Sequence, residues 1–211
     1  MTLRTALLTF VVLPIAAFAI VAREATKFSL KDPKSVNAMR FTLDGRFESM
    51  SGLATDISGE FTFDAKDVAA TRGKVIVQTS SLATSHANMT EHMHSARWMD
   101  VAKHPTIEFD IKKIEGVHPV EGKDQTWTMS VTGDFSMHGA TKSLTIPVRL
   151  TNLPGQLSKR NRLKGDLVML RSSFVIKRSD FGIDGEVSLD IVSDEVKVDF
   201  SIAAFAPAPA L

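Results

Sequence analysis

The sequence predicts an all-β protein in which about eight antiparallel strands close into a barrel, with one inserted α-helix. Six strand-sized segments alternate apolar and polar residues, and the apolar residues of each segment share one parity. In one segment, for example, the odd positions hold Trp127, Met129, Val131, Phe135 and Met137. Because side chains on a strand alternate between its two faces, the sheet has one apolar face. A single helical segment is too little to cover that face, so the sheet is expected to curl and cover itself.

The strands follow one another along the chain and are separated by turn residues. The period-two pattern is lost between Ser80 and Lys103, where the composition predicts a helix over 87–96. Pro147 falls on the polar face of its strand and removes one ladder hydrogen bond, which predicts an edge, a bulge or a seam. The expected strands lie at 28–30, 36–43, 57–63, 75–78, 107–111, 127–137, 144–150, 167–176 and 196–202.

The first 19 residues are typical of a secretory signal peptide. Arg4 precedes an apolar run that ends in Ala17-Phe18-Ala19, and the run is short for a membrane span. If the segment is retained as an anchor, the apolar run extends to residue 22. We therefore expect a periplasmic protein with a barrel domain over residues 27–205 and a disordered tail over 206–211.

Charge and cysteine content exclude several functions. Removal of the first 19 residues takes away one of the 25 Lys and Arg residues, Arg4, and none of the 24 acidic ones, so the remaining chain is formally neutral. A neutral protein lacks the positive field that gathers nucleic acid, which argues against such a partner. The absence of cysteine excludes disulfides, thiolate zinc sites and a thiol nucleophile.

The same alternation describes an outer-membrane barrel whose apolar face points outward. Such barrels carry girdles of aromatic residues at both interfaces, whereas this chain has no Tyr and two Trp. Large residues such as Phe109 and Phe135 fall in the middle of their strands instead. The pattern therefore favours a barrel with an apolar interior.

Three motifs, in the same order along the chain, resemble the YceI-like family. One runs from His92 to Asp100 and on through His104-Pro105-Thr106-Ile107-Glu108-Phe109, and it resembles that family's helix end, aromatic pair and Pro-Thr-Ile-x-Phe strand. The stretch 131–142 is similar to its Gly-x-Leu-x-x-His-Gly-x-Thr-Lys hairpin, and 177–183 to its Arg-Ser-Asp-Phe-Gly turn. The chain departs from the family at Lys34-Ser35, where His-Ser is frequent, and at Trp98-Met99, where two Phe are usual.

The resemblance implies a secreted, lipocalin-like antiparallel barrel that holds a long polyisoprenoid or similar lipid inside. It implies a binding or carrier protein with no chemistry of its own and no cofactor other than the lipid. The residue pattern alone leaves open whether the interior is a ligand cavity or a filled core. Candidates for the polar end of the ligand are His92, Arg97 and His138. The expected ligand-binding residues are Trp98, Met99, Phe109, Trp127, Met129, Phe135, Met137, Leu144, Ile146, Phe174 and Ile176.

An alternative function is a periplasmic copper-type metal carrier. Imidazole and thioether groups suit copper, and the helical insert carries His86, His92 and His94 among methionines. On a helix, however, residues two apart point in different directions, and ligands of one metal usually lie three or four apart. The spacing favours histidines on the helix surface and no metal site.

A hydrolase is disfavoured by the same kind of argument. Ser179, Asp180 and His138 provide suitable residue types, but the sequence has no Gly-x-Ser-x-Gly motif. The segment Arg178-Ser179-Asp180-Phe181-Gly182 is interpreted as a structural turn. Ser and Asp are expected to bond turn amides there, and Gly182 to adopt a left-handed conformation.

One loop concentrates positive charge, with Lys159, Arg160, Arg162 and Lys164 in six residues. Short charge runs usually face water, which is the default interpretation. The alternative is a contact with anionic lipid headgroups at a membrane surface. The sequence leaves open the identity of the lipid and whether two copies pair as a homodimer.

Overall fold

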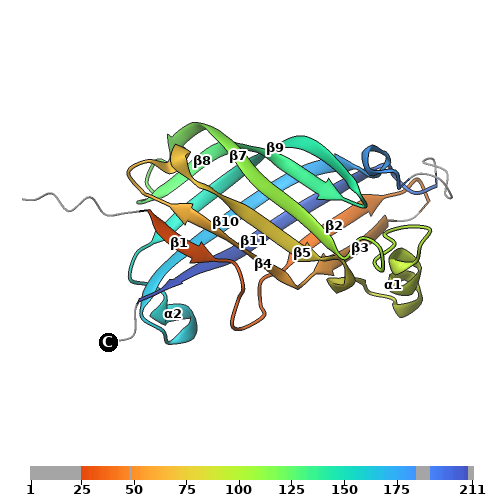
Figure 1. Ribbon diagram of the computed structural model, residues 1–211, viewed down its shortest axis with the longest axis horizontal. Helices are drawn as coiled ribbons and strands as arrows, with labels where there is room; N and C mark the ends of the chain where they lie inside the picture. The colour runs from red at the N-terminus through yellow and green to blue at the C-terminus, as the bar shows by residue number, and fades with distance from the viewer. Residues whose placement is uncertain (1–24, 48, 184–190, 209–211) are drawn as a thin grey trace, which may run out of the picture.

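The computed structural model describes residues 25–47, 49–183 and 191–208, so the signal-peptide prediction for residues 1–19 lies outside the described residues. One antiparallel sheet winds into a barrel (Figure 1). Its strand order is β1-β4-β5-β7-β8-β9-β10-β11, and pairing of β1 with β11 closes the circle. The strands are β1 (Thr26–Ser29), β2 (Met39–Asp44), β3 (Ser49–Ala54), β4 (Ile57–Phe63), β5 (Arg72–Gln78), β6 (Leu82–Thr84), β7 (Thr106–Pro119), β8 (Thr126–Met137), β9 (Ala140–Leu153), β10 (Gly165–Lys177) and β11 (Glu195–Pro207).

The eleven segments amount to eight long strands, because three of these strands are interrupted. β1 pairs with β4 and β2 pairs with β3, so β1 continues into β2 and β3 into β4. In the same way β3 pairs with β6 and β4 with β5, so β5 continues into β6. The predicted all-β barrel of about eight antiparallel strands with one inserted helix is confirmed.

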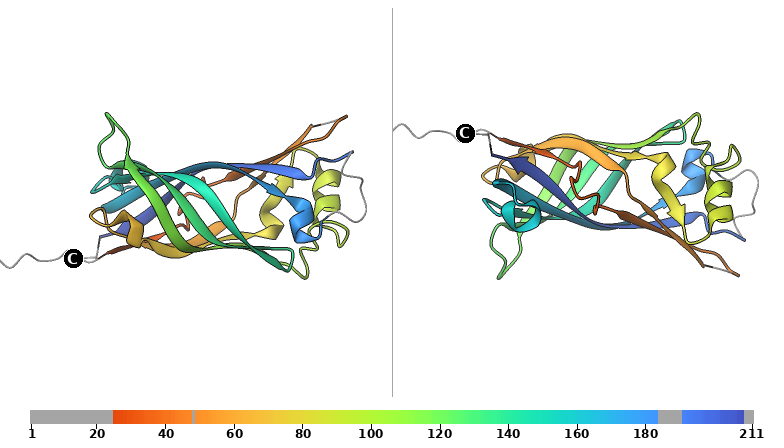
Figure 2. Two further views of the ribbon diagram at one scale, coloured as in Figure 1. Left: turned by 90° about the horizontal axis from the view of Figure 1, so that it is seen from above. Right: turned by 90° about the horizontal axis from the view of Figure 1, so that it is seen from below.

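Two helices mark the opposite ends of the barrel. Helix α1 (Ala87–His94) lies between β6 and β7, and it is two residues shorter than the predicted helix. The short helix α2 (Ser158–Asn161) lies at the other end, near the C-terminus (Figures 1 and 2). We call these the α1 end and the α2 end. Within the described part of the chain, every helix is too short or too polar to cross a membrane.

Pro147 lies at a seam, as its polar-face position predicts. The ladder between β9 and β10 joins residues 149–153 to 167–171 and stops short of Pro147, whereas pairing with β8 continues through Ser130 and Pro147. The Pro147 carbonyl accepts a hydrogen bond of 2.6 Å from the Ser172 hydroxyl instead. The missing N–H therefore costs no ladder bond at this position.

The last strand is longer than the sequence indicates. β11 continues through Pro207, and Ala206 and Pro207 pair with Asp166 and Gly165 of β10. The prediction of a disordered tail from residue 206 is therefore wrong for these two residues. The Ala-Pro composition gave no period-two signal, but the neighbouring strand β10 provides the pairing partners. Residues 209–211 lie outside the described part of the chain.

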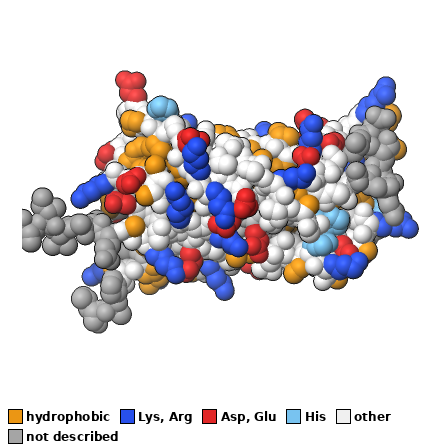
Figure 3. Space-filling model, turned by 45° about the horizontal axis from the view of Figure 1, so that its top comes forward, with side chains coloured by type: hydrophobic (Ala, Val, Ile, Leu, Met, Phe, Trp, Pro, Cys, Tyr) orange, Lys and Arg blue, Asp and Glu red, His pale blue; other side chains and the backbone are white. Residues whose placement is uncertain are grey.

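The apolar face points inward and the polar face meets water, as the shared parity predicts. In β8, Met129, Val131, Phe135 and Met137 are buried, while Ser130 between them is exposed. Charges of both signs are interspersed over the barrel face seen in Figure 3. The core therefore runs along the interior of the barrel.

A second, smaller core lies at the α2 end, outside the barrel. It consists of Leu157, Leu167, Ala203 and Phe205. Leu167 and Phe205 are paired across β10 and β11, on the face opposite to Val168 and Ala204. The segment leading into α2 thus covers the outer face of these strands, which explains why β11 is buried on both faces here.

Asn37 fills the interruption between β1 and β2. Its side-chain Nδ2 donates to the Ala203 carbonyl at 2.8 Å, and its Oδ1 accepts the Ala203 N–H at 2.9 Å. Nδ2 also reaches the Leu30 carbonyl at 3.2 Å. Because the side chain makes the two bonds that a neighbouring strand would make to Ala203, the barrel stays hydrogen-bonded where the backbone leaves the sheet.

Arg160 has a structural role, which corrects its interpretation as part of a solvated or membrane-facing loop. Its Nη2 lies 2.6 Å from Oδ2 of the buried Asp32, and its guanidinium lies 5.5 Å from the centre of the Phe205 ring. Asp32 also accepts backbone N–H groups of the following turn. The other basic residues of this loop, Lys159, Arg162 and Lys164, are exposed.

Asp32→Asn is expected to reduce stability in a pH-dependent way. Burial raises the pKa of Asp32, but hydrogen bonds from the Lys34 and Val36 amides and the Arg160 guanidinium outweigh burial and hold the pKa below its ordinary value. The ionised form therefore stabilises the fold above the unfolded-state pKa of about 3.9, and this contribution is lost as the pH falls through the lower folded-state value. We expect the variant to lose about 1–3 kcal/mol at pH 7.

Urea unfolding of both proteins at pH 7 and at pH 3 measures this difference. The gap between wild type and Asp32→Asn should narrow on acidification. Asp124→Asn is the control, because Asp124 is exposed in a turn and its substitution should have little effect at either pH. A gap for Asp32→Asn that is equal or larger at pH 3 would contradict the role assigned to the ionised carboxylate.

Candidate ligand-binding site

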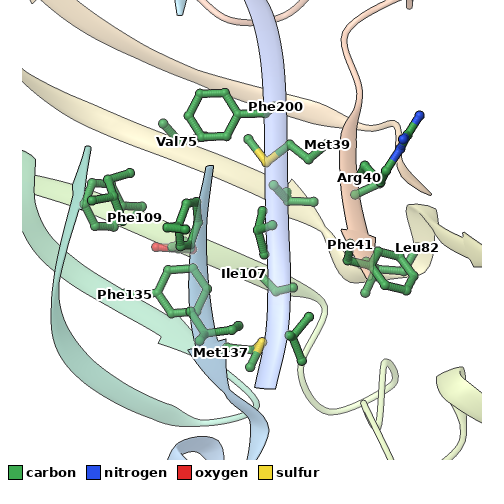
Figure 4. Close-up of a pocket in the computed structure, with 18 of the residues that line it drawn as sticks. Met39, Arg40, Phe41, Val75, Leu82, Ile107, Phe109, Phe135, Met137 and Phe200 are labelled. Atoms are coloured by element: carbon green, nitrogen blue, oxygen red, sulfur yellow. The ribbon is translucent and has the colours of Figure 1, made fainter. Parts of the chain in front are cut away.

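A cavity of about 260 Å³ lies inside the barrel, and its wall is almost entirely apolar. Residues from β2 through β11 and from the α1 region contribute to the wall. Figure 4 shows side chains of Phe109, Phe135, Met137 and Phe200 gathered around a common space. Its volume is slightly below the usual range of about 300–1,000 Å³ for small-molecule pockets.

Most of the sequence-predicted ligand-binding residues meet on this wall, and two do not. Trp127 is half-buried near the α2 end, where its ring lies 6.1 Å from that of Phe63, and Leu144 is half-buried on β9. Parity gave the correct face for both residues but no information on their position along the barrel axis. The predicted residues that do line the cavity are Trp98, Met99, Phe109, Met129, Phe135, Met137, Ile146, Phe174 and Ile176.

The sequence interpretation missed the wall contributed by β2 and β11. Met39, Phe41 and Leu43 of β2 line the cavity, as do Val198 and Phe200 of β11. The parity rule that selected the other residues would have found them, because each set alternates with outward-facing polar residues. Their strands were recognised, but their inward positions were not assigned to the site.

Methionine is concentrated on the cavity wall. Of the nine methionines in the chain, seven line the cavity. The unbranched thioether side chain adopts many shapes at little cost, so such a wall can adjust to a guest longer than the empty space. The seven are Met39, Met50, Met89, Met93, Met99, Met129 and Met137.

Two glycines at inward positions keep the centre of the barrel open. A Cβ on Gly133 would lie 2.7 Å from Cζ of Phe109, and a Cβ on Gly52 would lie 2.2 Å from Cζ of Phe41. The phenyl rings therefore occupy the space that a side chain at these positions would fill. Each ring therefore packs directly over a glycine of the neighbouring strand.

The α1 end of the cavity is covered by an aromatic and cationic cluster. Trp98 lies between His92, with ring centres 6.2 Å apart, and Arg178, whose guanidinium lies 5.3 Å from the indole. Arg178 is only 3% exposed and donates to the carbonyls of Ile183, Val192 and Ser193. It lines the cavity and also joins the 3-10 helix η3 (Arg178–Phe181) to the residues ahead of β11.

The turn formed by η3 agrees with the sequence prediction at Gly182 and differs from it in the carboxylate that accepts the turn amide. Gly182 is left-handed with φ of 69°, as predicted. The acceptor of the turn amide is Asp194 rather than Asp180, because Asp194 accepts the Ser179 N–H at 2.9 Å and its hydroxyl at 2.8 Å. Burial raises the pKa of Asp194, but the two bonds from Ser179 and the positive charges of Arg178 and Lys177 together outweigh burial and lower it. Asp194 follows in the next turn, so local sequence gave no signal for it.

The three residues predicted to bind the polar end of a ligand lie in different places in the structure. His92 lines the cavity, whereas Arg97 is exposed and outside the wall. His138 Nδ1 lies 2.9 Å from the Phe181 carbonyl, and its ring centre lies 4.6 Å from that of His104. His138 thus joins the β8–β9 turn to η3 and does not reach the cavity wall.

The histidines of the helical insert have separate surroundings. His94 Nε2 lies 2.7 Å from the Leu82 carbonyl, His92 packs against Trp98, and His86 is exposed at the start of α1. Across the described ranges, no three His, Asp or Glu side chains are grouped to hold a metal ion. Among the described residues, the copper-type alternative therefore has no cluster of three such side chains. Ser179 and His138 likewise bond to other partners, namely Asp194 and the Phe181 carbonyl.

Comparisons with known proteins agree on one family. A sequence model described as the YceI-like domain matches residues 28–204. UPF0312 proteins of Pseudomonas paraeruginosa and Azotobacter vinelandii are each 30% identical over 151 residues, which is 72% of this chain and 71% of theirs. An Enterobacter UPF0312 protein is 34% identical over 99 residues, which is 47% of each chain.

Solved structures share the fold at lower identity. Burkholderia cenocepacia BcnA matches with a TM-score of 0.64 and 20% identity, covering 79% of this chain and 95% of BcnA. A polyisoprenoid binding domain from Saccharophagus degradans matches with a TM-score of 0.61 and 14% identity, covering 87% of this chain and all of that domain. At such identities the likeness establishes the barrel architecture alone.

Proposed function

This chain belongs to the YceI-like family, and we propose that its barrel binds a long, slender lipid of isoprenoid type in the interior cavity. The observation that carries the proposal is the continuous apolar cavity along the barrel, lined by seven methionines and several aromatic rings. The name of the Saccharophagus degradans domain, which is a polyisoprenoid binding domain, supports the ligand class.

Binding rather than chemistry is the function that this wall favours. Each buried methylene contributes about 0.8 kcal/mol of hydrophobic free energy, so a chain of many carbons can bind tightly without a charged partner. The wall offers hydrocarbon contacts over most of its surface, and two of its charged groups, Arg178 and Lys74, are engaged in other contacts. Specificity then comes from the width and length of the cavity.

We further propose that the protein acts as a periplasmic carrier. The segment 1–19, with Arg4 ahead of an apolar run, supports export by a signal peptide. A carrier must hold its lipid away from water while its own surface stays hydrated, and the charged outer face suits this task (Figure 3). The exposed Lys159, Arg162 and Lys164 at the α2 end support a contact with anionic headgroups during transfer.

Extraction and mass spectrometry test the proposed ligand class. Protein purified from its native host without detergent is extracted with organic solvent, and the extract is compared with that of the heat-denatured, washed protein. We expect a prenyl lipid at about one molecule per barrel, and uptake of added geranylgeraniol by the delipidated protein. Absence of both would remove the lipid-binding function.

A further inference from the structure

The wall of the barrel has a break in its backbone pairing between β9 and β10. The ladder between these strands joins residues 149–153 to residues 167–171 and stops there, although both strands continue toward the α1 end. β9 stays paired with β8 as far as Ala140, and β10 stays paired with β11 as far as Lys177. Residues 140–148 of β9 and 172–177 of β10 therefore have no backbone pairing with each other. We call this stretch the β9–β10 gap.

Pro147 explains why the ladder stops where it does. In an antiparallel strand, the N–H and the carbonyl of one residue point to the same side. The Pro147 carbonyl accepts a hydrogen bond from Ser172 of β10, so the Pro147 nitrogen also faces β10. That nitrogen carries no hydrogen, and β9 cannot continue the ladder through this position.

Two like charges weaken the last pair of the ladder. Arg149 and Arg171 lie directly opposite each other, and both are exposed. Like charges in this arrangement are destabilising. The residues paired with them on the flanking strands, Thr128 and Ser201, carry no charge that would offset the repulsion. The gap therefore begins at a weakened part of the sheet.

Side-chain hydrogen bonds connect the two strands at each end of the gap. Next to the ladder, the Ser172 hydroxyl donates to the Pro147 carbonyl at 2.6 Å. At the α1 end, Nδ1 of His138 in the β8–β9 turn lies 2.9 Å from the carbonyl of Phe181 in η3, which follows β10. A hydrogen bond contributes about 0.5–1.5 kcal/mol net. Separating β9 from β10 here breaks few such bonds, whereas separating β9 from β8 would break a complete ladder.

Apolar side chains on both strands lead from the gap to the cavity. Ile146 of β9 and Phe174 and Ile176 of β10 line the cavity wall. Leu144 shares the inward parity of Ile146 and is part-exposed, although it lies outside the wall. On the outer face of β10, Val175 is 48% exposed. Hydrocarbon contacts thus extend from the outer surface across the gap to the cavity.

The interior is packed with rings toward both ends of the barrel. Trp98 covers the α1 end of the cavity and packs against the guanidinium of Arg178. Toward the α2 end, Phe61 lines the cavity, whereas Phe63 and Phe28 are 3% and 1% exposed and do not. The Phe28 ring lies 5.5 Å from that of Phe61 and 6.2 Å from that of Phe63. A guest that entered through either end would have to displace these rings.

We propose that the β9–β10 gap is a lateral portal through which the lipid enters and leaves the barrel. This inference rests on the proposed lipid-binding function. The portal opens when the Ser172–Pro147 hydrogen bond breaks and the two strands move apart, while the ladders on either side stay intact. The hydrocarbon chain then passes between Ile146 and Phe174, so it remains in apolar contact on its way to the cavity.

A cleavable cross-link across the gap tests this assignment. The chain has no cysteine, so Thr145→Cys together with Val175→Cys introduces one reactive pair, on the outer face of the two strands. A short bismaleimide with an internal disulfide connects the pair in the delipidated protein. Binding of geranylgeraniol is followed by stopped-flow tryptophan fluorescence, because Trp98 lines the cavity.

The cross-link should lower both the association and the dissociation rate at least about 10-fold. The equilibrium affinity should stay unchanged, because a portal controls passage and does not alter the contacts of the bound lipid. Reduction of the internal disulfide separates the strands again and leaves the adducts in place. It should restore both rates.

The matched control connects β9 to β8 instead. Thr132→Cys together with Thr145→Cys uses the same position on β9 and its ladder partner on β8, where the two threonine hydroxyls lie 2.8 Å apart. Because that ladder is complete, the same cross-link should leave both rates at their wild-type values.

Ser172→Ala tests the portal without a cross-link. It removes the hydrogen bond to Pro147, and Ser172 does not line the cavity. Both rates should rise about 2- to 10-fold at unchanged affinity, as expected for loss of one hydrogen bond from the closed state. Urea unfolding establishes that each variant is folded.

Two outcomes would overturn the portal. Wild-type rates in both the cross-linked gap variant and Ser172→Ala would mean that the lipid enters through an end of the barrel. An equal slowing by the two cross-links would mean that they act through general stiffening. Either result leaves the proposed function intact, because wild type still binds the lipid. If wild type takes up no geranylgeraniol and yields no lipid on extraction, the proposed function fails and this inference fails with it.

Discussion

Asn37→Leu is expected to lower the free energy of unfolding by about 3–5 kcal/mol, because it leaves three buried backbone groups without partners at about 1–3 kcal/mol each. These groups are the N–H and carbonyl of Ala203 and the carbonyl of Leu30, all of which bond to the Asn37 amide. Leucine has nearly the same shape and cannot replace any of the three bonds. The loss falls where β11 passes from β1 to β2, so it also weakens closure of the barrel.

Urea unfolding followed by far-UV circular dichroism measures this loss. Asn152→Leu is the matched control, because the Asn152 amide donates to the Gln125 side chain, which is part-exposed and can turn to water. That variant should lose less than about 1 kcal/mol. If Asn37→Leu loses no more stability than Asn152→Leu, the hydrogen bonds of the Asn37 amide do not stabilise closure of the barrel.

The interior face of the barrel could be predicted because strand geometry has a period of two and a wrong parity would bury charge. That rule places Phe109, Phe135 and Ile146 on the inward face, and in the structure all three line the cavity. The rule does not include position along the barrel axis, which depends on strand tilt and stagger. Trp127 therefore has the correct face and still lies outside the cavity.

The remaining errors concern contacts between residues that are distant in sequence. Arg160 pairs with Asp32, which lies 128 residues away in the sequence. The basic composition of the loop therefore gave no sign that one of its residues forms a structural ion pair. The partner of Ser179 is Asp194, which is reached only after the chain reverses into β11.

Ile146→Trp is expected to abolish lipid binding, with a loss of at least about 100-fold in affinity, or 2.7 kcal/mol. Ile146 is 5% exposed, lies in the middle of β9 and pairs with Val131, so both residues line the cavity. An indole at this position enters the space that a guest would occupy. Because the space is empty without a ligand, the strain should be at the low end of the 1–3 kcal/mol typical of overpacked cores.

Thr145→Trp separates blocking of the cavity from a general effect of tryptophan on β9. Thr145 is the adjacent residue, is exposed and points to the opposite face of the strand, so its variant should bind geranylgeraniol as wild type does. Binding is measured by competition with a fluorescent polyene, and stability by urea unfolding. Retained binding in Ile146→Trp would place the ligand outside the barrel. A third outcome would contradict the cavity itself. In that case Ile146→Trp unfolds severely, Thr145→Trp is tolerated and wild type takes up no lipid. Side chains would then fill the interior, and no guest would be accommodated.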